Sequence, residues 1–567
     1  MSDNIYEKLS IKRKQLQDDG LIPSWYATAG LQLFEAKYEY ETNGRSVRGQ
    51  FERIASTAAK HLVGTKYESL AYDKFFELMW NGWLSLSTPV MANMGTDRGL
   101  PVSCSGTYVD DSVDGFYSNM REVALLTKHG FGTASYLGNI RSRGSDISVG
   151  GKAAGIVPVF KNHVRVAQDV SQGSSRRGAW AGYLEITHGD FDELCDFVMA
   201  EPDDCNIGWI VKDDFIAKMN AGDEESHRRF QKAMKLKMVT GRGYFCFTDK
   251  ANRNRPQMYK DLDMYVNAYQ LCNEITLFSD KDHTYTCVLS SMVVSRYREW
   301  KDTDAVYWAT IFLDCVAQEF IDKAKDISGL EKAVRFTKKG RALGLGQAGL
   351  HTLFQQEMLA FESLPAVWLS NEVASHIKDE SIRATKDMAI ELGEPEWCKG
   401  YGVRNTHLVA IAPTKSSALL VGGISEGINP DPAMTYTQNT SAGDIDRITP
   451  VLYNLMKSKG VYNKKTIADI TKQMGSVQKV DWLTEEEKLV FRTAFEMKQD
   501  AIVRMASQRG RYIDQWQSLN LFFSSEEDPR EIARVHQQAF LDERILGLYY
   551  VYSKAGVQAA TECVACQ

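Results

Sequence analysis

Two cysteines and a carboxylate occur together in YQLCNEITLFSDKDHTYTCVLSSM, residues 269–292. Cys272 and Glu274 are two positions apart, so on an extended backbone their side chains would project from the same face. A thiol beside a carboxylate could act on one small substrate, with sulfur chemistry at the first group and proton transfer at the second. A buried cysteine near a surface glutamate explains the pair as simply. The rest of the chain favours the chemical interpretation.

Two further pairs of cysteines could form disulfides. Cys563 and Cys566 make a CxxC near the last residue, on a run of small residues. A zinc site would need two more ligands, which the neighbouring residues do not offer, so thiol–disulfide exchange is favoured. Cys104 lies in VSCSGTYV, which alternates as a strand does, and Cys287 lies in a second strand-like run. The spacing leaves open whether these two meet.

A hydroxyl-rich turn, PTKSS at residues 413–417, precedes an apolar run. A helix beginning there would offer free N–H groups and its dipole to a phosphate, with the hydroxyls as extra donors. An ordinary helix cap explains the same residues.

No metal site is expected. The segments EITH and EESH match the ExxH pattern of carboxylate-bridged metal sites, which need two matched helices and further glutamates. Glu185 falls in a strand-like run and Glu224 in a charged cluster, so neither segment fits.

The elements that must position these residues change character near residue 100. The first hundred residues look helical, and LAYDKFFELMWNGWLSL carries apolar side chains at helical spacing. Beyond Ser87, short apolar runs alternate with loops rich in Gly and Ser, and strand-like segments alternate with helical ones. This alternation predicts an α/β catalytic domain built as a barrel.

Two later segments carry more specific expectations. RALGLGQAGLHTLF, residues 341–354, lacks the strand and acidic residue that dinucleotide binding requires, so its glycines indicate a helix packed closely on its neighbours. Thr484 and Glu487 form a capping-box pattern for a long helix, with Phe491, Phe495 and Ile502 on one stripe.

Composition is that of a globular protein, with 567 residues, 44% hydrophobic and 25% charged. A net charge of -6 argues against a protein that neutralises long stretches of nucleic-acid phosphate. No apolar run reaches the roughly 20 residues of a membrane helix, and the first residues lack the apolar core of a secretory signal. Ten cysteines without dense pairing fit a reducing compartment, so a cytoplasmic protein is expected.

Taken together, these residues resemble the large, catalytic subunit of class I ribonucleotide reductase. The resemblance runs from about residue 85 to the last residue, and the motifs follow the family's order: STPVMANMG, SCSGTYVDDSVDG, LCNEI, TCVLS, RALGLGQAGL, APTKSS, DQWQSLN, LYY and ECVACQ. It implies a ten-stranded α/β barrel with a central finger loop, preceded by a helical N-terminal domain. The implied divisions are residues 1–100, 101–530 and 531–567, the last a segment with radical-relay tyrosines and a mobile redox tail.

The resemblance also implies roles for the reacting groups. Cys272 matches the thiyl-radical cysteine that removes the 3′ hydrogen of a ribonucleotide, and Glu274 matches the carboxylate that takes the 3′-hydroxyl proton. Cys104 and Cys287 match the dithiol that delivers two electrons and becomes a disulfide as the 2′ hydroxyl leaves as water. Gln270 stands where the family usually has a substrate-binding asparagine, so its longer arm would keep that role with shifted geometry.

Supply of the radical and of electrons is implied as well. Tyr549 and Tyr550 match the stacked tyrosines that relay a radical from a separate small subunit, with Tyr549 nearer the reacting cysteine. Cys563 and Cys566 match the tail dithiol, which thioredoxin or glutaredoxin would restore. No cofactor is expected on this chain, because the radical metallocofactor belongs to the small subunit.

Two groups of binding residues follow from the same motifs. The substrate-phosphate site would comprise Ser87, Thr88, Thr414, Lys415, Ser416 and Ser417. The site for dNTP or ATP effectors would comprise Asp111, Arg141, Gln172 and Arg176. A homodimer is expected, without nucleic-acid or membrane partners. The N-terminal ATP-cone signature is missing, so we expect specificity regulation without strong inhibition by dATP.

Two alternatives remain. An adenosylcobalamin-dependent class II reductase shares the barrel and the active-site cysteines, but it has no need of a tyrosine relay. An inactive nucleotide-binding regulatory protein has no need of the redox cysteines, Glu274 and both tyrosines.

Overall fold

The computed structural model describes residues 2–41, 45–102, 104–170, 178–202, 205–440 and 443–553. Helices form most of the first hundred residues, as expected: α1 (Ser2–Asp18), α2 (Thr28–Lys37), α3 (Val47–Lys60), α4 (Glu68–Trp80) and α5 (Thr88–Asn93). Ser46 caps α3 by accepting a hydrogen bond from the N–H of Gly49. In α4, Phe75 and Met79 are buried one turn apart and join the main core.

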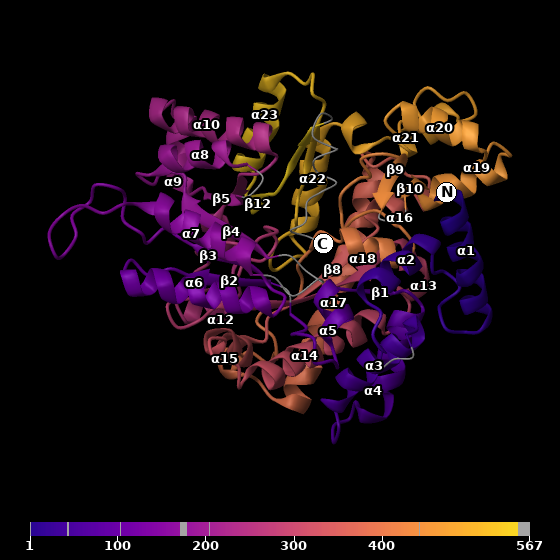
Figure 1. Cartoon of the computed structure of the whole chain (residues 1–567), viewed down its shortest axis with the longest axis horizontal. Coiled ribbons are helices and arrows are strands. Elements are labelled where there is room, and N and C mark those ends of the chain that lie inside the picture. Colours follow the sequence, from indigo (N-terminus) through magenta and orange to yellow (C-terminus); the bar gives the residue numbers. More distant parts are fainter. Residues whose placement is uncertain are drawn as a thin grey trace.

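One mixed sheet lies at the centre, with helices around it (Figure 1). The first half of the sheet is parallel and consists of β2 (Cys104–Tyr108), β3 (Gly132–Tyr136), β4 (Ala179–Glu185), β5 (Ile207–Ile210) and β6 (Tyr244–Cys246). The second half runs in the opposite direction, because β7 (Tyr285–Val293) pairs antiparallel with β2 and parallel with β8 (Leu343–Ala348). Two short strands, β1 (Leu84–Leu86) and β12 (Gly547–Leu548), complete the nine-stranded sheet.

Backbone hydrogen bonds continue the sheet beyond its regular strands and close it. The N–H of Leu343 in β8 donates to the carbonyl of His407, and Ile411 forms a parallel bridge to Gln517. The segment after Gln517 continues into β11 (Leu521–Phe523), which pairs with β13 (Val551–Ser553), and β12 in the same C-terminal stretch pairs with β6. The predicted α/β barrel behind a helical domain is confirmed. The boundaries at residues 100 and 530 stay predictions.

The remaining helices follow or flank these strands: α6 (Val113–Lys128), α7 (Ile156–Asp169), α8 (Phe191–Ala200), α9 (Asp213–Asn220), α10 (Glu224–Thr240), α11 (Thr248–Asn254), α12 (Gln257–Asp261), α13 (Tyr297–Trp300), α14 (Ala305–Ala324), α15 (Glu331–Gly340), α16 (Leu350–Gln356), α17 (Leu364–Leu392), α18 (Lys415–Leu420), α19 (Pro450–Ser458), α20 (Lys464–Lys472), α21 (Glu485–Val490), α22 (Gln499–Gly510) and α23 (Pro529–Leu541). Short 3-10 turns are η2 (Val294–Arg296), η3 (Glu396–Cys398) and η4 (Ala494–Glu496). Within the described ranges, no helix is both long enough and apolar enough to cross a bilayer.

A small second core accompanies the barrel. The hairpin of β9 (Thr435–Thr440) and β10 (Gly443–Ile448) leads into α19, α20 and α21, which lie together at one edge of the molecule (Figure 1). Their apolar side chains, among them Leu452, Met456 and Phe491, form a cluster separate from the main core.

Two expectations about local structure were wrong. Residues 343–348 form strand β8 and not a helix; a Cβ on Gly346 would lie 2.8 Å from the carbonyl oxygen of Ala410, so the glycine permits close approach of the neighbouring strand. The capping box at Thr484 is present, but α21 ends at Val490 because Thr493 and Glu496 form a second capping box that starts a new turn.

A buried ionic cluster fastens the second half of the barrel to α14. The Asp314 carboxylate accepts hydrogen bonds from Arg341 at 2.7 and 2.9 Å, from Arg404 at 2.9 Å and from Asn405 at 2.9 Å. Burial would raise the pKa of Asp314, but the two guanidinium charges outweigh it and hold that pKa well below its usual range. Arg341 lies two residues before the start of β8, and Asn405 lies just before the segment at His407 that bonds to β8. Asp314 therefore fixes where both segments begin.

Asp314→Asn is therefore expected to lower the free energy of unfolding by about 3 to 5 kcal/mol, because it leaves the buried Arg341 and the partly buried Arg404 without a carboxylate. Chemical denaturation measures the change. The matched control is Asp322→Asn on the same helix, where the side chain is 48% exposed, and it should alter stability by less than about 0.5 kcal/mol. Equal effects of the two substitutions would contradict the assignment.

Candidate active site

The loop between α12 and β7 passes through the interior of the barrel. Residues 263–283 contain no helix or strand, yet most of them are buried. Three walls hold this loop: Tyr183 of β4 donates from its hydroxyl to the Gln270 carbonyl at 2.6 Å, and Asn273 donates to the Phe245 carbonyl of β6 at 3.2 Å. On another side, the N–H of Trp516 donates to the Glu274 carbonyl at 2.9 Å. We call this stretch the finger loop.

The finger loop turns sharply at Cys272. Residues 271–273 form a turn, and Asn273 has a left-handed backbone with φ 67°, so the backbone at Cys272 is not extended. Gln270 holds the turn, because its Oε1 accepts hydrogen bonds from the N–H groups of Cys272 and Asn273, the latter at 2.8 Å. The turn still leaves Cys272 and Glu274 on the same side.

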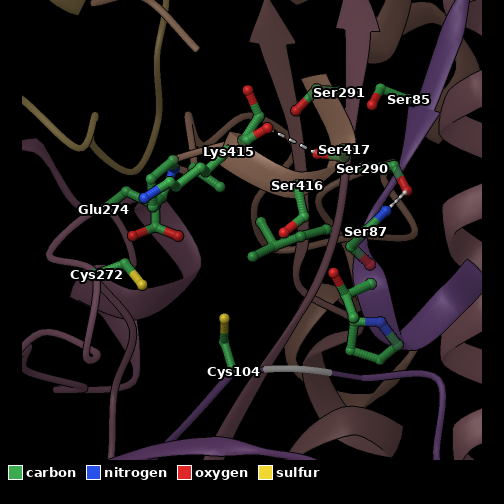
Figure 2. A pocket seen from close by; sticks show the side chains of 16 residues that line it. Ser85, Ser87, Cys104, Cys272, Glu274, Ser290, Ser291, Lys415, Ser416 and Ser417 are labelled. Atoms are coloured by element: carbon green, nitrogen blue, oxygen red, sulfur yellow. Dashed lines mark hydrogen bonds between the residues drawn. The ribbon is translucent and has the colours of Figure 1, made fainter. Parts of the chain in front are cut away.

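A pocket of about 620 Å³, measured to its open mouth, lies at this turn. Figure 2 shows Cys272 and Glu274 on one wall, Cys104 below them with its sulfur turned into the pocket, and Ser87 and Ser416 across from them. The pocket thus brings the thiol of Cys104 to the neighbouring pair Cys272 and Glu274, from which it is distant in the sequence.

Cys287 lies on β7, next to Cys104 of β2, and is not among the residues that line the pocket. The two residues are directly opposite in the antiparallel pairing of β2 with β7, and opposite residues of such a pair have Cα atoms about 4.5–5.5 Å apart and side chains on one face. Neither cysteine is in a disulfide in this structure, and that separation permits one between them. Burial raises the pKa of the Cys287 thiol far above its ordinary value, so it stays protonated.

The carboxyl group of Glu274 is fully buried. Burial raises its pKa to about 8, against smaller lowering effects from its own backbone, Ser518 and Gln270. Ser518 places its hydroxyl 3.1 Å from Glu274 Oε2, while Oε1 forms no hydrogen bond within the described residues. At neutral pH this carboxyl group is mostly protonated.

The wall opposite the thiols is rich in hydroxyl groups. The short helices α5 and α18 both begin at the pocket, after Ser87 and Thr414 respectively. Their first N–H groups have no partner within the helix, and Lys415 adds a cation. All six residues expected to bind substrate phosphates line the pocket: Ser87, Thr88, Thr414, Lys415, Ser416 and Ser417.

Tyr549 and Tyr550 lie between β12 and β13, with both rings buried and their centroids 4.2 Å apart. The same stretch touches the cysteine turn, because a Cβ on Gly547 would lie 2.6 Å from Nδ2 of Asn273. Only glycine permits this approach. Gly547 precedes Tyr549 by two residues, so its contact with Asn273 anchors the tyrosine pair beside the turn that carries Cys272.

Two of the four expected effector residues meet at a distance from the pocket. Arg141 donates from its Nε to Asp111 at 2.7 Å, and both side chains are partly exposed. Gln172, Arg176, Cys563 and Cys566 lie outside the described residues. In the part of the chain that is described, no three His, Cys, Asp or Glu side chains gather where they could share a metal ion.

Sequence reasoning missed the residues directly behind the pocket. Gln515 donates from its amide to Cys287 Sγ at 3.4 Å and to the Leu343 carbonyl at 2.9 Å, and Ser518 contacts the finger loop. Both belong to the motif DQWQSLN, a mostly polar run that is buried from residue 515 to residue 520. Nothing in its local pattern distinguishes these buried polar side chains from those of a surface loop.

Comparison with known proteins identifies the family. A family model described as "Ribonucleotide reductase, barrel domain" matches residues 102–227, 225–399 and 395–551, and one described as "Ribonucleotide reductase, all-alpha domain" matches residues 24–99. The chain belongs to the ribonucleotide reductase family.

Individual relatives agree with this assignment. A putative ribonucleoside-diphosphate reductase large subunit of Frog virus 3 is 32% identical and covers 91% of this chain and 95% of its own length. The large subunit from Danio rerio is 26% identical over 94% of this chain and 76% of its own. The solved class Id ribonucleotide reductase alpha subunit of Actinobacillus ureae superposes with a TM-score of 0.86 at 36% identity, covering 94% of this chain and 98% of the other.

The raised pKa of Glu274 predicts a pH-dependent cost in stability for this reductase-family chain. In the unfolded chain the carboxyl ionises near its ordinary pKa of 4.5, whereas in the folded chain it ionises near 8. Stability is therefore lost as pH rises between these values. Glu274→Gln, which cannot ionise, should be more stable than the native chain by on the order of 1 to 4 kcal/mol at pH 8.

Chemical denaturation at pH 5.5 and pH 8 tests this expectation, and the difference between the two chains should shrink at the lower pH. Glu77→Gln on the exposed face of α4 controls for the amide substitution itself. A difference that does not vary with pH would show that burial does not govern this carboxyl.

The pairing of Cys104 with Cys287 predicts a specific disulfide. Treating the folded chain with diamide should join these two residues, because no backbone movement is required, and peptide mass spectrometry identifies the bond. Cys315, buried on α14, is the control and should stay a free thiol. Cys287→Ser should abolish the cross-link; its persistence would mean that Cys104 reacts with another cysteine.

Proposed function

We propose that this chain reduces ribonucleotides to 2′-deoxyribonucleotides for DNA precursor synthesis, with a thiyl radical at Cys272. One observation carries the proposal: Cys272, Glu274 and Cys104 face one pocket, with Cys287 paired directly behind. Membership of the ribonucleotide reductase family supports the same reaction.

Each reacting group has a stated part in the chemistry. Cys272 removes the 3′ hydrogen atom and later returns it, so it is unchanged overall. Glu274 takes the proton of the 3′ hydroxyl and gives it back when that hydroxyl is restored in the product. The carbon–oxygen bond at the 2′ position breaks and the oxygen leaves as water, while Cys104 and Cys287 give up two electrons and two protons and form a disulfide. The protonated state of the buried Cys287 thiol suits this donation.

The state of Glu274 sets the direction of the pH dependence. Only the ionised carboxylate can accept a proton. Because its pKa is about 8 in the folded chain, turnover should rise with pH through this value.

The radical comes from a separate small subunit, which holds the metallocofactor, and Tyr549 and Tyr550 relay it. The close contact of their rings supports this role, as does the anchoring of Gly547 against the turn of Cys272. Gln270 keeps the turn in place and does not line the pocket, so we assign it to positioning rather than to substrate binding.

Binding and regulation complete the proposal. Substrate phosphates sit among the hydroxyls at the starts of α5 and α18. A dNTP or ATP effector binds at Asp111 and Arg141, together with Gln172 and Arg176. Neither matching family model is an ATP-cone, and dATP should not inhibit strongly. The tail cysteines re-reduce the dithiol, thioredoxin or glutaredoxin restores them, and the chain acts as a homodimer in the cytoplasm.

The similarity to a class I alpha subunit favours this reaction scheme over an adenosylcobalamin-dependent class II enzyme. Of the two schemes, only the class I scheme uses the buried tyrosine pair. An inactive regulatory protein is disfavoured because the described redox cysteines and Glu274 converge on one pocket.

Reduction of CDP in the presence of effector, with and without a candidate small subunit, tests the function. Turnover should require the small subunit, and Tyr549→Phe should lower it by at least about 100-fold, because phenylalanine has no hydroxyl hydrogen to transfer. Nucleotide binding should be unchanged. Tyr297→Phe, a buried tyrosine bonded to Glu372, is the matched control. Turnover with adenosylcobalamin alone would establish the class II alternative, and full activity of Tyr549→Phe would remove the relay.

A further inference from the structure

The hydroxyl of Ser518 contacts two parts of the active site at once. Its Oγ lies 2.6 Å from the carbonyl oxygen of Cys272 and 3.1 Å from Oε2 of Glu274. Ser518 is buried and is held in the barrel wall by its own N–H, which donates to the Ile411 carbonyl at 2.9 Å. Since it lies behind the pocket, it acts on substrate only through the two residues that it touches.

The chemistry of these groups allows one arrangement for each protonation state of Glu274 that satisfies the serine hydroxyl. A serine hydroxyl has one proton to donate and lone pairs with which to accept. The Cys272 carbonyl can only accept. The Glu274 carboxyl accepts when it is ionised and can donate when it is protonated. Ser518 can therefore donate to Cys272 while it accepts from protonated Glu274, or donate to ionised Glu274 and leave the Cys272 carbonyl.

We propose that Ser518 is a positioning residue that couples the protonation of Glu274 to the turn that carries Cys272. It donates to the Glu274 carboxylate before the 3′-hydroxyl proton is taken, and to the Cys272 carbonyl once Glu274 holds that proton. No bond to carbon forms or breaks at Ser518, and its proton only changes acceptor. The inference rests on the proposed function in assigning Glu274 to proton transfer.

Loss of this hydroxyl has a predictable direction. A hydrogen bond donated to a carboxylate stabilises its ionised form, and Ser518 already lowers the pKa of Glu274 against the larger effect of burial. Removing the hydroxyl should therefore raise that pKa further. Other titratable groups around the carboxyl are unaltered by the substitution: Cys272 on the finger loop, Tyr285 and Cys287 on β7, Cys104 on β2 and Lys415 on α18.

Infrared titration of the full chain, without a small subunit, tests the coupling directly. The carboxyl band of Glu274 is identified by its loss in Glu274→Gln. In Ser518→Ala the midpoint of this band should move upward by about one pH unit, and in Ser518→Thr, which keeps a hydroxyl, it should return toward the native value. Ser381→Ala removes a buried serine that bonds Thr310, and this control should leave the midpoint unchanged.

The second readout is the pH profile of CDP reduction with the small subunit. The acid limb of the profile should move upward in Ser518→Ala by the same amount as the infrared midpoint, and a general loss of folding would not move it. Because the infrared titration needs no turnover, a chain that reduces no nucleotide overturns the proposed function and leaves the coupling measurable.

An unmoved infrared midpoint in Ser518→Ala overturns the inference, whatever the activity. Where the alanine variant does not fold, Ser518→Cys supplies a weaker donor of similar size. Its midpoint should move upward by less than one pH unit, and a native midpoint in that variant would equally reject the coupling.

Discussion

The structure depends on one constraint: an irregular loop passes through the inside of a closed sheet, away from water. Loops usually lie on the surface because their backbone polar groups need partners. Here the barrel wall supplies them, through Tyr183, Phe245 and Trp516. Each of these partners also fixes the position of the turn at Cys272, so the barrel wall and the place of this thiol are specified together.

The same enclosure determines the electrostatics of the site. With little water nearby, burial favours the neutral forms of Glu274 and Cys287. A site that generated thiolates would need cations beside its sulfurs, whereas here the neighbour of Cys287 Sγ is the neutral amide of Gln515. The pocket therefore suits transfer of hydrogen atoms and protons between neutral groups. Groups suited to binding a charged part of a ligand, the hydroxyls and Lys415, lie on the opposite wall of the pocket.

Much of this could be predicted from the sequence, for identifiable reasons. The strand-like runs that contain Cys104, Glu185 and Cys287 are β2, β4 and β7, and the motif order identified residues that line the pocket. The turn at Cys272 could not be predicted, because it is held by the side chain of Gln270 and by distant strands rather than by local preference. The glycines of β8 could not be assigned from the local sequence, because they are explained by contacts with Leu289 of β7 and with the backbone at Ala410. The role of Ser518 was invisible, since its two contacts lie 244 and 246 residues away in the chain.

The contact of Gly547 with the amide of Asn273 has a consequence for how this chain can vary. A single methyl group there would enter the space of the amide and push the C-terminal stretch outward. Because Tyr549 follows Gly547 by two residues, such a displacement would also carry the buried tyrosine pair away from the turn of Cys272. A glycine at this position lets the two stretches of backbone stay in contact, since it has no side chain to separate them.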